Sequence, residues 1–166
     1  MFPYYSNYMT ALLFGNPKAY AYVRGIPDYD TIQGMVLFYD TGNGSIVTAD
    51  FKGLPTEDSV CGGEIFGFHI HEGERCSGTK EDPLADTGLH LNPDRCEHPH
   101  HMGDMPPLFE NRGKAWCAFY TERFRIWDII GKTVVLHRGS DDFKSQPSGD
   151  SGMKIGCGII RRELQQ

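Results

Sequence analysis

Short runs in which hydrophobic and polar residues alternate recur along the chain, separated by glycine, proline and other turn-forming residues. Alternation with a period of two is typical of β-strands, because successive side chains point to opposite faces. This pattern predicts strands at residues 18–24, 33–39, 45–51, 64–71, 114–120, 123–127, 132–137 and 154–161. It shows no convincing helix and no internal repeat. We therefore predict an all-β protein, an antiparallel sandwich or barrel of eight strands.

The segments between the predicted strands differ in length and chemistry. Asn43-Gly44 lies between two predicted strands and is a strong hairpin signal. Residues 1–17 are rich in tyrosine and phenylalanine, and we expect an N-terminal extension that packs on the body or on a partner. Residues 72–112 and 138–153 are predicted as two long loops. A loop of about 40 residues in a compact domain is normally functional or disordered, and the histidines of this one indicate order imposed by a metal.

Length and charge limit the functions that the chain can have. Its 166 residues allow one domain with a substantial core, which we place at residues 18–166. No apolar run approaches the roughly 20 residues of a membrane span, and no basic run typical of nucleic-acid binders is present. The net charge is −6, so an anionic substrate would need a local positive field. The start of the chain lacks the features of a secretory signal, which predicts a cytoplasmic protein unless an upstream segment was removed.

The histidines are the most informative residues, because none of the seven lies in the first 68 positions. They occur at positions 69, 71, 90, 98, 100, 101 and 137. His69 and His71 are two apart on a predicted strand, so both imidazoles point to one face. Alone, such a pair is more typical of a solvated strand face. The other histidines, with Asp104 three residues after His101, favour a metal site instead.

Five short blocks carry a resemblance to a known family. They are Gly67-Phe-His-Ile-His-Glu72, Gly88-Leu-His-Leu-Asn-Pro93, His101-Met-Gly-Asp104, Val134-Val-Leu-His137 and Gly156-Cys-Gly-Ile-Ile160. In order and spacing they resemble the copper/zinc superoxide dismutases, over roughly residues 18–161. Each block alone is weak, and the combination is specific. The resemblance implies an eight-stranded antiparallel Greek-key β-barrel with two long functional loops and with its metals on the outer face.

The resemblance also implies roles for individual residues. It makes His69, His71, His90 and His137 the copper ligands, and His90, His98, His101 and Asp104 the zinc ligands. His90 would bridge both metals, and Asp141 would link His69 to His98 and fix their ring orientations. These residue types suit the two metals, since imidazole binds both and three nitrogens with one carboxylate make a closed tetrahedral zinc site. His100 has no counterpart in the family; we expect it to be exposed, although it could replace His98.

The five cysteines are interpreted in part through the same resemblance. Cys76 and Cys157 occupy the positions of the family's intrachain disulfide. Cys117 lies in the middle of a predicted strand, where it would be a small core residue. Cys61 and Cys96 could pair with each other or stay free.

The reaction implied by the resemblance is dismutation of superoxide to oxygen and hydrogen peroxide, an antioxidant function. Copper would alternate between +2 and +1, and His90 would hand a proton to the peroxide. The family has an arginine three residues before the second disulfide cysteine, and here that position is Lys154. Because lysine keeps the positive charge of arginine, we expect Lys154 to guide the anion. It lacks the planar fork of donors, so it should orient the anion less strictly. Arg138 and Lys144 are the only cations of the predicted loop 138–153, where they are solvated charges or steer the anion.

Two further functions are compatible with the sequence. The first is a dismutase-like module that binds copper or zinc with little or no turnover, suggested by Lys154 and the short loops. The second is a hydrolytic zinc enzyme, for which Glu72 is the only general base near the motif. The sequence is silent on oligomeric state, and a homodimer is possible.

Overall fold

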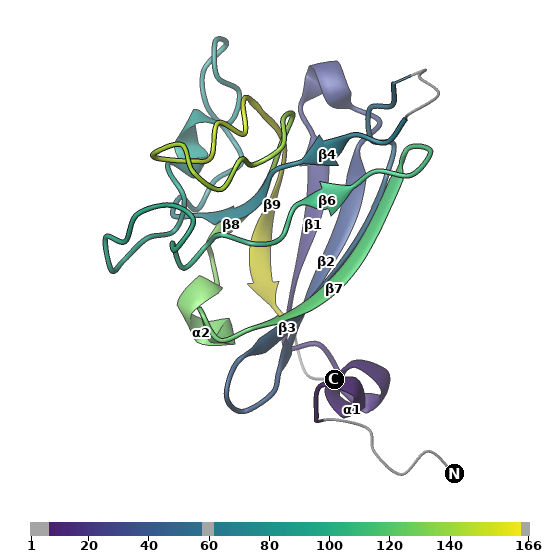
Figure 1. Ribbon diagram of the computed structural model, residues 1–166, viewed down its shortest axis with the longest axis vertical. Coiled ribbons are helices and arrows are strands. Elements are labelled where there is room, and N and C mark those ends of the chain that lie inside the picture. Colours follow the sequence, from purple (N-terminus) through teal and green to yellow (C-terminus); the bar gives the residue numbers. More distant parts are fainter. Residues whose placement is uncertain (1–6, 58–61, 164–166) are drawn as a thin grey trace.

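The computed structural model describes residues 7–57 and 62–163, which form a curled antiparallel sheet closed by a smaller one (Figure 1). Within these residues the strands are β1 (Ala19–Gly25), β2 (Gln33–Asp40), β3 (Ser45–Lys52), β4 (Ile65–Phe66), β5 (Phe68–His71), β6 (Leu108–Phe109), β7 (Lys114–Thr121), β8 (Thr133–His137) and β9 (Lys154–Arg162). The helices are α1 (Asn7–Phe14) and α2 (Ile126–Ile129), with 3-10 turns η1 (Pro27–Tyr29) and η2 (Ala85–Thr87).

The seven-stranded sheet has the order β5-β8-β9-β1-β2-β3-β7, and β4 pairs with β6. All pairs are antiparallel, and neighbours such as β3 and β7 are far apart in sequence, as expected of Greek-key connections. β4 leads directly into β5 at one edge, and β6 contacts β7 at the other, so the small sheet closes the curl (Figure 1). The predicted all-β Greek-key barrel is therefore confirmed, with nine strands among the described residues rather than eight.

Alternate side chains of the strands fill the interior of the barrel. Phe51 and Phe68 meet edge to face with their ring centroids 5.9 Å apart, and Phe38 and Phe124 do so at 6.3 Å. These rings are among the largest fully buried side chains of the described residues. Such aromatic pairs stabilise a core beyond the effect of area burial alone. The outer sides of the strands are thus left to carry polar groups.

One predicted strand is wrong, because residues 126–129 form the short helix α2. Ile126 and Ile129 are both buried, and their spacing of three places them on one side of a helical turn. Asp128 closes the start of this turn, since its carboxylate accepts a hydrogen bond from the Arg125 N–H (2.8 Å). The hydrophobic residues of this segment fit the period of a strand as well as that of a helix, so the pattern alone did not distinguish the two structures.

A second predicted strand, residues 64–71, is divided at Gly67 into β4 and β5. The Gly67 N–H donates to the Gly139 carbonyl (2.7 Å), and the His137 N–H donates to the Gly67 carbonyl (2.8 Å). A Cβ atom at Gly67 would lie 2.7 Å from Cβ of Ser151, so glycine is required for this close approach. Strands β4 and β5 consequently pair with different partners, β6 and β8.

Two further features were not predicted. The helix α1 lies in the N-terminal extension and contacts β2 and β3 (Figure 1), and the two-residue strand β6 interrupts the first predicted loop. The boundary between extension and domain at residue 17 stays a prediction. The hairpin expected at Asn43-Gly44 is present between β2 and β3. Among the described residues, no helix has the length and apolar character needed to span a membrane.

The two predicted loops lie together on one side of the barrel (Figure 1). We refer to residues 72–107 as the long loop and to residues 138–153 as the short loop. The side chain of Gln146 in the short loop hydrogen bonds to the backbone of His98 in the long loop. The disulfide between Cys76 and Cys157 joins the long loop to β9. These links hold the loops over β5, where the histidines begin.

Candidate metal centre

Strand β5 presents His69 and His71 to the loops, because the alternate residues of the strand face the core. Phe68 and Ile70 are fully buried among the hydrophobic side chains. The long loop docks on the backbone of β5: the Ile70 N–H donates to the Gly103 carbonyl (2.8 Å) and the Leu91 N–H donates to the Ile70 carbonyl (2.8 Å). A Cβ atom at Gly103 would lie 2.1 Å from the Ile70 oxygen, so only glycine permits this approach. The docking places His90 beside His71 and Asp104 beside His69.

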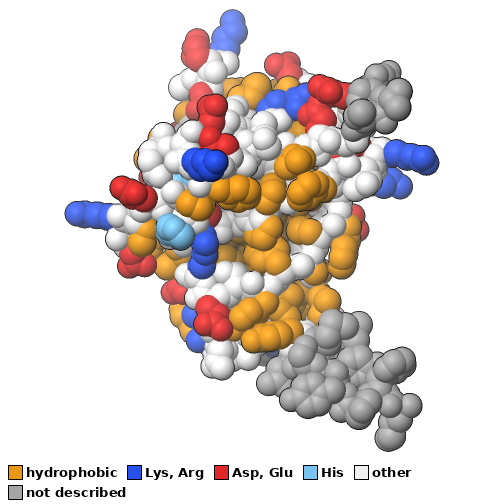
Figure 2. Space-filling view, in the orientation of Figure 1, with side chains coloured by type: hydrophobic (Ala, Val, Ile, Leu, Met, Phe, Trp, Pro, Cys, Tyr) orange, Lys and Arg blue, Asp and Glu red, His pale blue; other side chains and the backbone are white. Residues whose placement is uncertain are grey.

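Two groups of possible metal ligands result from this docking. The first cluster is His69, His71, His90 and His137, and the second cluster is His90, His98, His101 and Asp104. In each cluster, one ligand atom per residue lies within 4.8 Å of all the others. His90 belongs to both, and every residue that the sequence analysis assigned to a metal is in one of them. His100 is exposed and belongs to neither. Figure 2 shows little histidine surface on the face it draws, consistent with the burial of the other six.

In the first cluster, His69, His71 and His137 each donate a hydrogen bond from one ring nitrogen. The other ring nitrogen of each therefore carries a lone pair and no proton. His71 Nδ1 donates to the Gly88 carbonyl (3.0 Å), and His137 Nδ1 donates to the Gly152 carbonyl (3.1 Å). Their Nε2 atoms then both carry lone pairs and face each other at 3.1 Å. Two facing lone pairs repel unless a cation lies between them. His69 donates from Nε2 to Asp141 (2.7 Å), which leaves its Nδ1 as a further ligand atom.

The second cluster is arranged in the same way around Asp104. His98 donates from Nε2 to Asp141 (2.9 Å), which leaves Nδ1 at 3.1 Å from an Asp104 oxygen. The ring nitrogens Nδ1 of His90 and His101 lie 2.7 Å and 3.4 Å from the other Asp104 oxygen. The His101 N–H donates to Asp104 Oδ2 (2.9 Å) and fixes the carboxylate. One nitrogen from each of three histidines and the Asp104 carboxylate therefore lie close enough to bind one metal ion.

Several of these nitrogens have no protein partner. They are Nδ1 of His69, Nε2 of His90, Nδ1 of His98 and Nδ1 of His101, all buried. A buried polar atom without a partner is costly, so it calls for an explanation. Metal coordination supplies one, because the free lone pairs point into the clusters. The four nitrogens of the first cluster suit copper, and the donor set of the second suits tetrahedral zinc. The residues present therefore fit both metals.

Burial also keeps imidazoles of the site in the neutral form, which is the form that binds a metal. Burial, together with neighbouring imidazoles, lowers the pKa of His69 to about 4 and that of His137 to about 3. Burial also holds the pKa of His71 well below its ordinary value. Burial favours the protonated form of Asp141, but hydrogen bonds from His69, the Phe143 N–H and His98 outweigh it and hold the carboxyl pKa well below its usual range. At neutral pH His69, His71 and His137 are therefore neutral and the Asp141 carboxylate is charged, as metal binding requires.

These shifts predict that the metal-free protein loses stability as the pH falls from about 7 towards 4. The unfolded histidines take up protons near pH 6.5, whereas the folded ones stay neutral, so acid favours the unfolded state. Between pH 6.5 and 5, each fully neutral imidazole contributes up to about 2 kcal/mol to this loss. Urea unfolding of the metal-free protein at pH 7.5, 6 and 5 measures it. A free energy of unfolding that is constant over this range contradicts the prediction, and the exposed control H100Q should leave the slope unchanged.

Gln146 is a residue of this site that sequence reasoning missed. Its side-chain Nε2 donates to the His98 carbonyl (2.8 Å), and its Oε1 accepts from the His98 N–H (2.9 Å). Arg123 holds the same segment, because its Nη1 donates to the Pro99 carbonyl (2.7 Å). No signal in the sequence points to Gln146, since it lies 48 positions from His98.

We expect Q146A to weaken zinc binding by about tenfold, as is typical of groups that orient a metal ligand. Loss of the amide removes both hydrogen bonds that fix the backbone of His98. Competition with a zinc chelator measures the affinity. The control Q33A changes an exposed glutamine on β2 and should bind zinc as the unmodified protein does. Equal zinc affinities for Q146A and Q33A would show that the amide does not orient His98.

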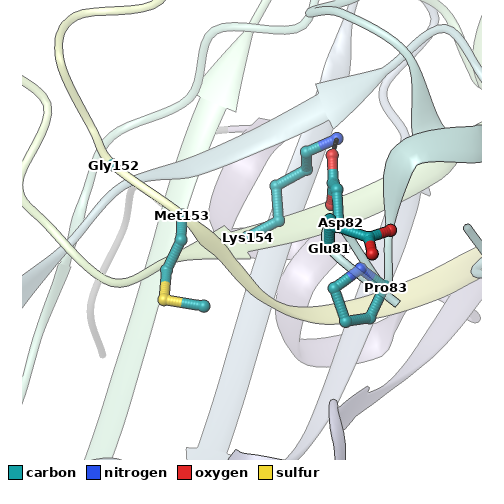
Figure 3. Close-up of a pocket in the computed structure, with 6 residues that line it drawn as sticks. All are labelled: Glu81, Asp82, Pro83, Gly152, Met153 and Lys154. Atoms are coloured by element: carbon teal, nitrogen blue, oxygen red, sulfur yellow. Dashed lines mark ion pairs between the residues drawn. The ribbon is translucent and has the colours of Figure 1, made fainter. Parts of the chain in front are cut away.

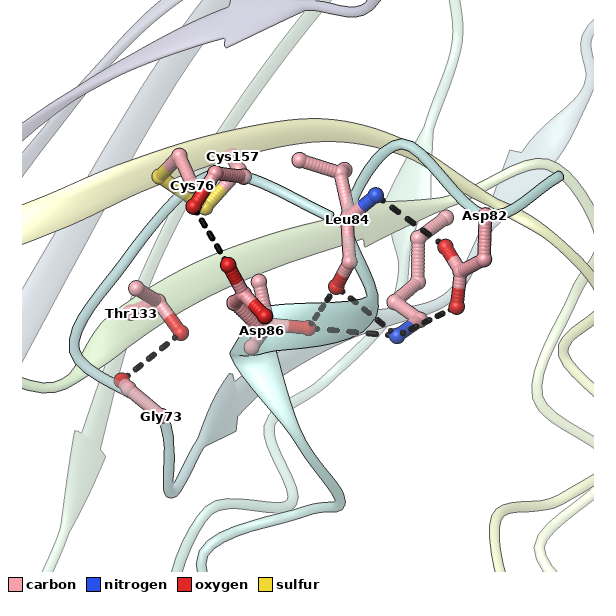
Figure 4. The surroundings of a disulfide bond; sticks show 10 residues. Gly73, Cys76, Asp82, Leu84, Asp86, Thr133 and Cys157 are labelled. Carbon is pink, nitrogen blue, oxygen red and sulfur yellow. Dashed lines mark hydrogen bonds and ion pairs between the residues drawn. A yellow bond between two sulfur atoms is a disulfide. The ribbon is translucent and has the colours of Figure 1, made fainter. Parts of the chain in front are cut away.

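The predicted disulfide between Cys76 and Cys157 is confirmed, with the two Cα atoms 5.6 Å apart. Near the disulfide, the Thr133 hydroxyl of β8 donates to the Gly73 carbonyl (3.2 Å), so the start of the long loop is tied to the barrel at two points (Figure 4). Cys117 is half-buried, and burial raises the pKa of its thiol to about 11. Cys61 lies outside the described residues, so whether it pairs with Cys96 or stays free is still open.

The three cations of interest have different surroundings. Lys154 pairs with His137 across β8 and β9, and its Nζ donates to the Leu84 carbonyl (3.0 Å). Arg138 forms an ion pair with Glu64, so its charge is compensated. Lys144 is exposed. Glu72, the candidate general base, is also exposed and belongs to neither cluster.

Comparison with known proteins gives consistent matches. The family model described as copper/zinc superoxide dismutase (SODC) matches residues 32–160. Superoxide dismutase (Cu-Zn) 2 of Aquifex aeolicus is 31% identical over 143 residues, covering 77% of this chain and 78% of that protein. Extracellular superoxide dismutase (Cu-Zn) of Rattus norvegicus is 31% identical over 145 residues, covering 81% of this chain and 57% of that protein.

A relative with another name matches over a similar stretch. The copper chaperone for superoxide dismutase of Rattus norvegicus is 27% identical over 146 residues, covering 80% of this chain and 49% of that protein. The family match runs from β2 into β9 and includes both loops and all residues of the two clusters. Together, the fold, the shared His90 and these matches show that the chain belongs to the copper/zinc superoxide dismutase family.

Proposed function

We propose that this chain is an active copper/zinc superoxide dismutase, which converts two superoxide anions and two protons into oxygen and hydrogen peroxide. The observation that carries the proposal is the set of buried, unpartnered histidine nitrogens in two clusters that share His90. When bound, copper would take an electron from one superoxide and give it to a second, while zinc has no redox role. The first cluster would hold the copper and the second cluster the zinc.

The residues of the chain have distinct roles in this proposal. His90 Nε2 faces the first cluster without a protein partner, so it can accept a proton and donate it to the peroxide product. His90 Nδ1 lies 2.7 Å from Asp104, which orients the ring. Asp141 fixes His69 and His98 by one hydrogen bond from each and thereby connects the two clusters. Lys154, beside His137, provides a positive charge for a small anion in a chain whose net charge is −6.

A second candidate is a metal-binding module that holds or delivers copper with little turnover. The similarity to a protein named copper chaperone for superoxide dismutase favours it, as does the presence of Lys154 in place of the family's arginine. In this case the clusters would bind the same metals, but superoxide would be converted slowly. Binding of metal alone therefore does not separate the two candidates.

Dismutation by the protein loaded with copper and zinc, compared with K154R and K154E, is the test. We expect activity well above that of the same amount of free copper with a chelator, a similar or higher rate for K154R, and a rate at least several times lower for K154E. Activity no greater than the copper control would reject the enzyme and leave the binding module. Equal rates for K154E and the unmodified protein would reject the guiding role of Lys154.

A further inference from the structure

A cavity of about 290 Å³ lies between the long loop and the beginning of β9. It is lined by Glu81, Asp82, Pro83, Gly152, Met153 and Lys154 (Figure 3). Acidic residues of the long loop form one side, and the end of the short loop with the first residue of β9 forms the other. Lys154 is the only cation among these lining residues.

This cavity adjoins the first cluster through two of its lining residues. The Gly152 carbonyl accepts the hydrogen bond from His137 Nδ1 (3.1 Å). Lys154 is the register partner of His137 between β8 and β9. The electric field inside the cavity therefore acts on the first cluster as well.

The charge of Lys154 is opposed by a carboxylate within the same cavity. Nζ lies 3.2 Å from Asp82 Oδ2, and it also donates to the Leu84 carbonyl (3.0 Å) and the Thr87 hydroxyl (3.3 Å). The lysine side chain is only 17% exposed, whereas that of Asp82 is 48% exposed. Figure 3 shows the ammonium group directed towards the Asp82 carboxylate. A small anion that approaches Lys154 consequently meets a negative charge first.

We propose that Asp82, by pairing with Lys154, lowers the affinity of the first cluster for small anions. The inference rests on the proposed function in one respect, namely that copper occupies the first cluster. Asp82 contacts none of the histidines and acts through the lysine. The backbone of the loop does not depend on its charge, because the Leu84 N–H donates to Asp82 Oδ1 (3.1 Å), which an asparagine oxygen can replace.

Azide, a small anion that binds copper(II) in an open position, is the probe for this proposal. Titration of the copper- and zinc-loaded protein is followed by the change in its visible absorption. We expect D82N to bind azide severalfold more tightly than the unmodified protein, because the charge of Lys154 is then no longer opposed by a carboxylate. In the K154M background the same substitution should change the affinity by less than twofold. The control D86N removes a charge from the same loop without contact to Lys154 and should have little effect.

An azide affinity of D82N within twofold of that of the unmodified protein would overturn the proposal. So would an equal gain with and without Lys154, because Asp82 would then act through the general field of the loop. Failure of the proposed function gives a different result. Loaded protein that binds azide with the expected order of affinities but does not convert superoxide would reject the enzyme and retain the role of Asp82.

Discussion

H90A is expected to lower the rate of dismutation by at least roughly 100-fold. It should also weaken the binding of both metals. No other described residue belongs to both clusters, so its loss removes one nitrogen ligand from each. It also removes Nε2, the nitrogen proposed to donate the proton. Dismutation assays and metal analysis of H90A after loading measure both effects.

The matched control is H100A, which removes a histidine from the same loop. His100 is exposed and outside both clusters, so H100A should keep the activity and the metal content of the unmodified protein. H90A with near-normal copper, zinc and activity would contradict the shared role of His90. Loss of zinc in H100A would instead assign His100 the place given to His98.

Removal of the disulfide with C76S is expected to lower the free energy of unfolding by about 4–5 kcal/mol in the chain-entropy model. The bond joins residues separated by 81 positions and therefore restricts a large part of the unfolded chain. It also holds the long loop, which carries His90, against β9. Urea unfolding of the metal-free protein under oxidising conditions measures the loss without a contribution from bound metal.

Two comparisons make the disulfide prediction specific. K80A changes an exposed residue of the same loop and should unfold at nearly the same urea concentration as the unmodified protein. Reduction of the unmodified protein should reproduce the effect of C76S. A free energy of unfolding for C76S within about 1 kcal/mol of the unmodified value would show that the loop is held mainly by its other contacts, such as that of Thr133 with Gly73.

The sequence predicted the regular strands well because their pattern is local. β2 and β3 are separated by an Asn-Gly turn and alternate clearly, and both form where expected. α2 was missed because Ile126 and Ile129 fit a strand and a helix equally well in so short a segment. The division at Gly67 depends on the backbone of residue 139, and no local pattern reports a contact across that distance.

The metal-binding residues were accessible to sequence reasoning for another reason. Histidines in characteristic short blocks identified the members of both clusters before the structure brought them together. Gln146 and Asp82 carried no such signal, since their side chains act on residues 48 and 72 positions away. Their roles depend on how the two loops pack, which the composition of either loop does not reveal.

Titration of the metal-free protein first with zinc and then with copper(II), followed by metal analysis and the copper visible band, tests the central claim most directly. The claim is that the two clusters form one copper site and one zinc site joined by His90. It predicts saturation at one zinc and one copper per chain, with a copper band that shifts when zinc is left out. Copper that binds equally well to the H71A/H137A variant, or a band indifferent to zinc, would contradict it.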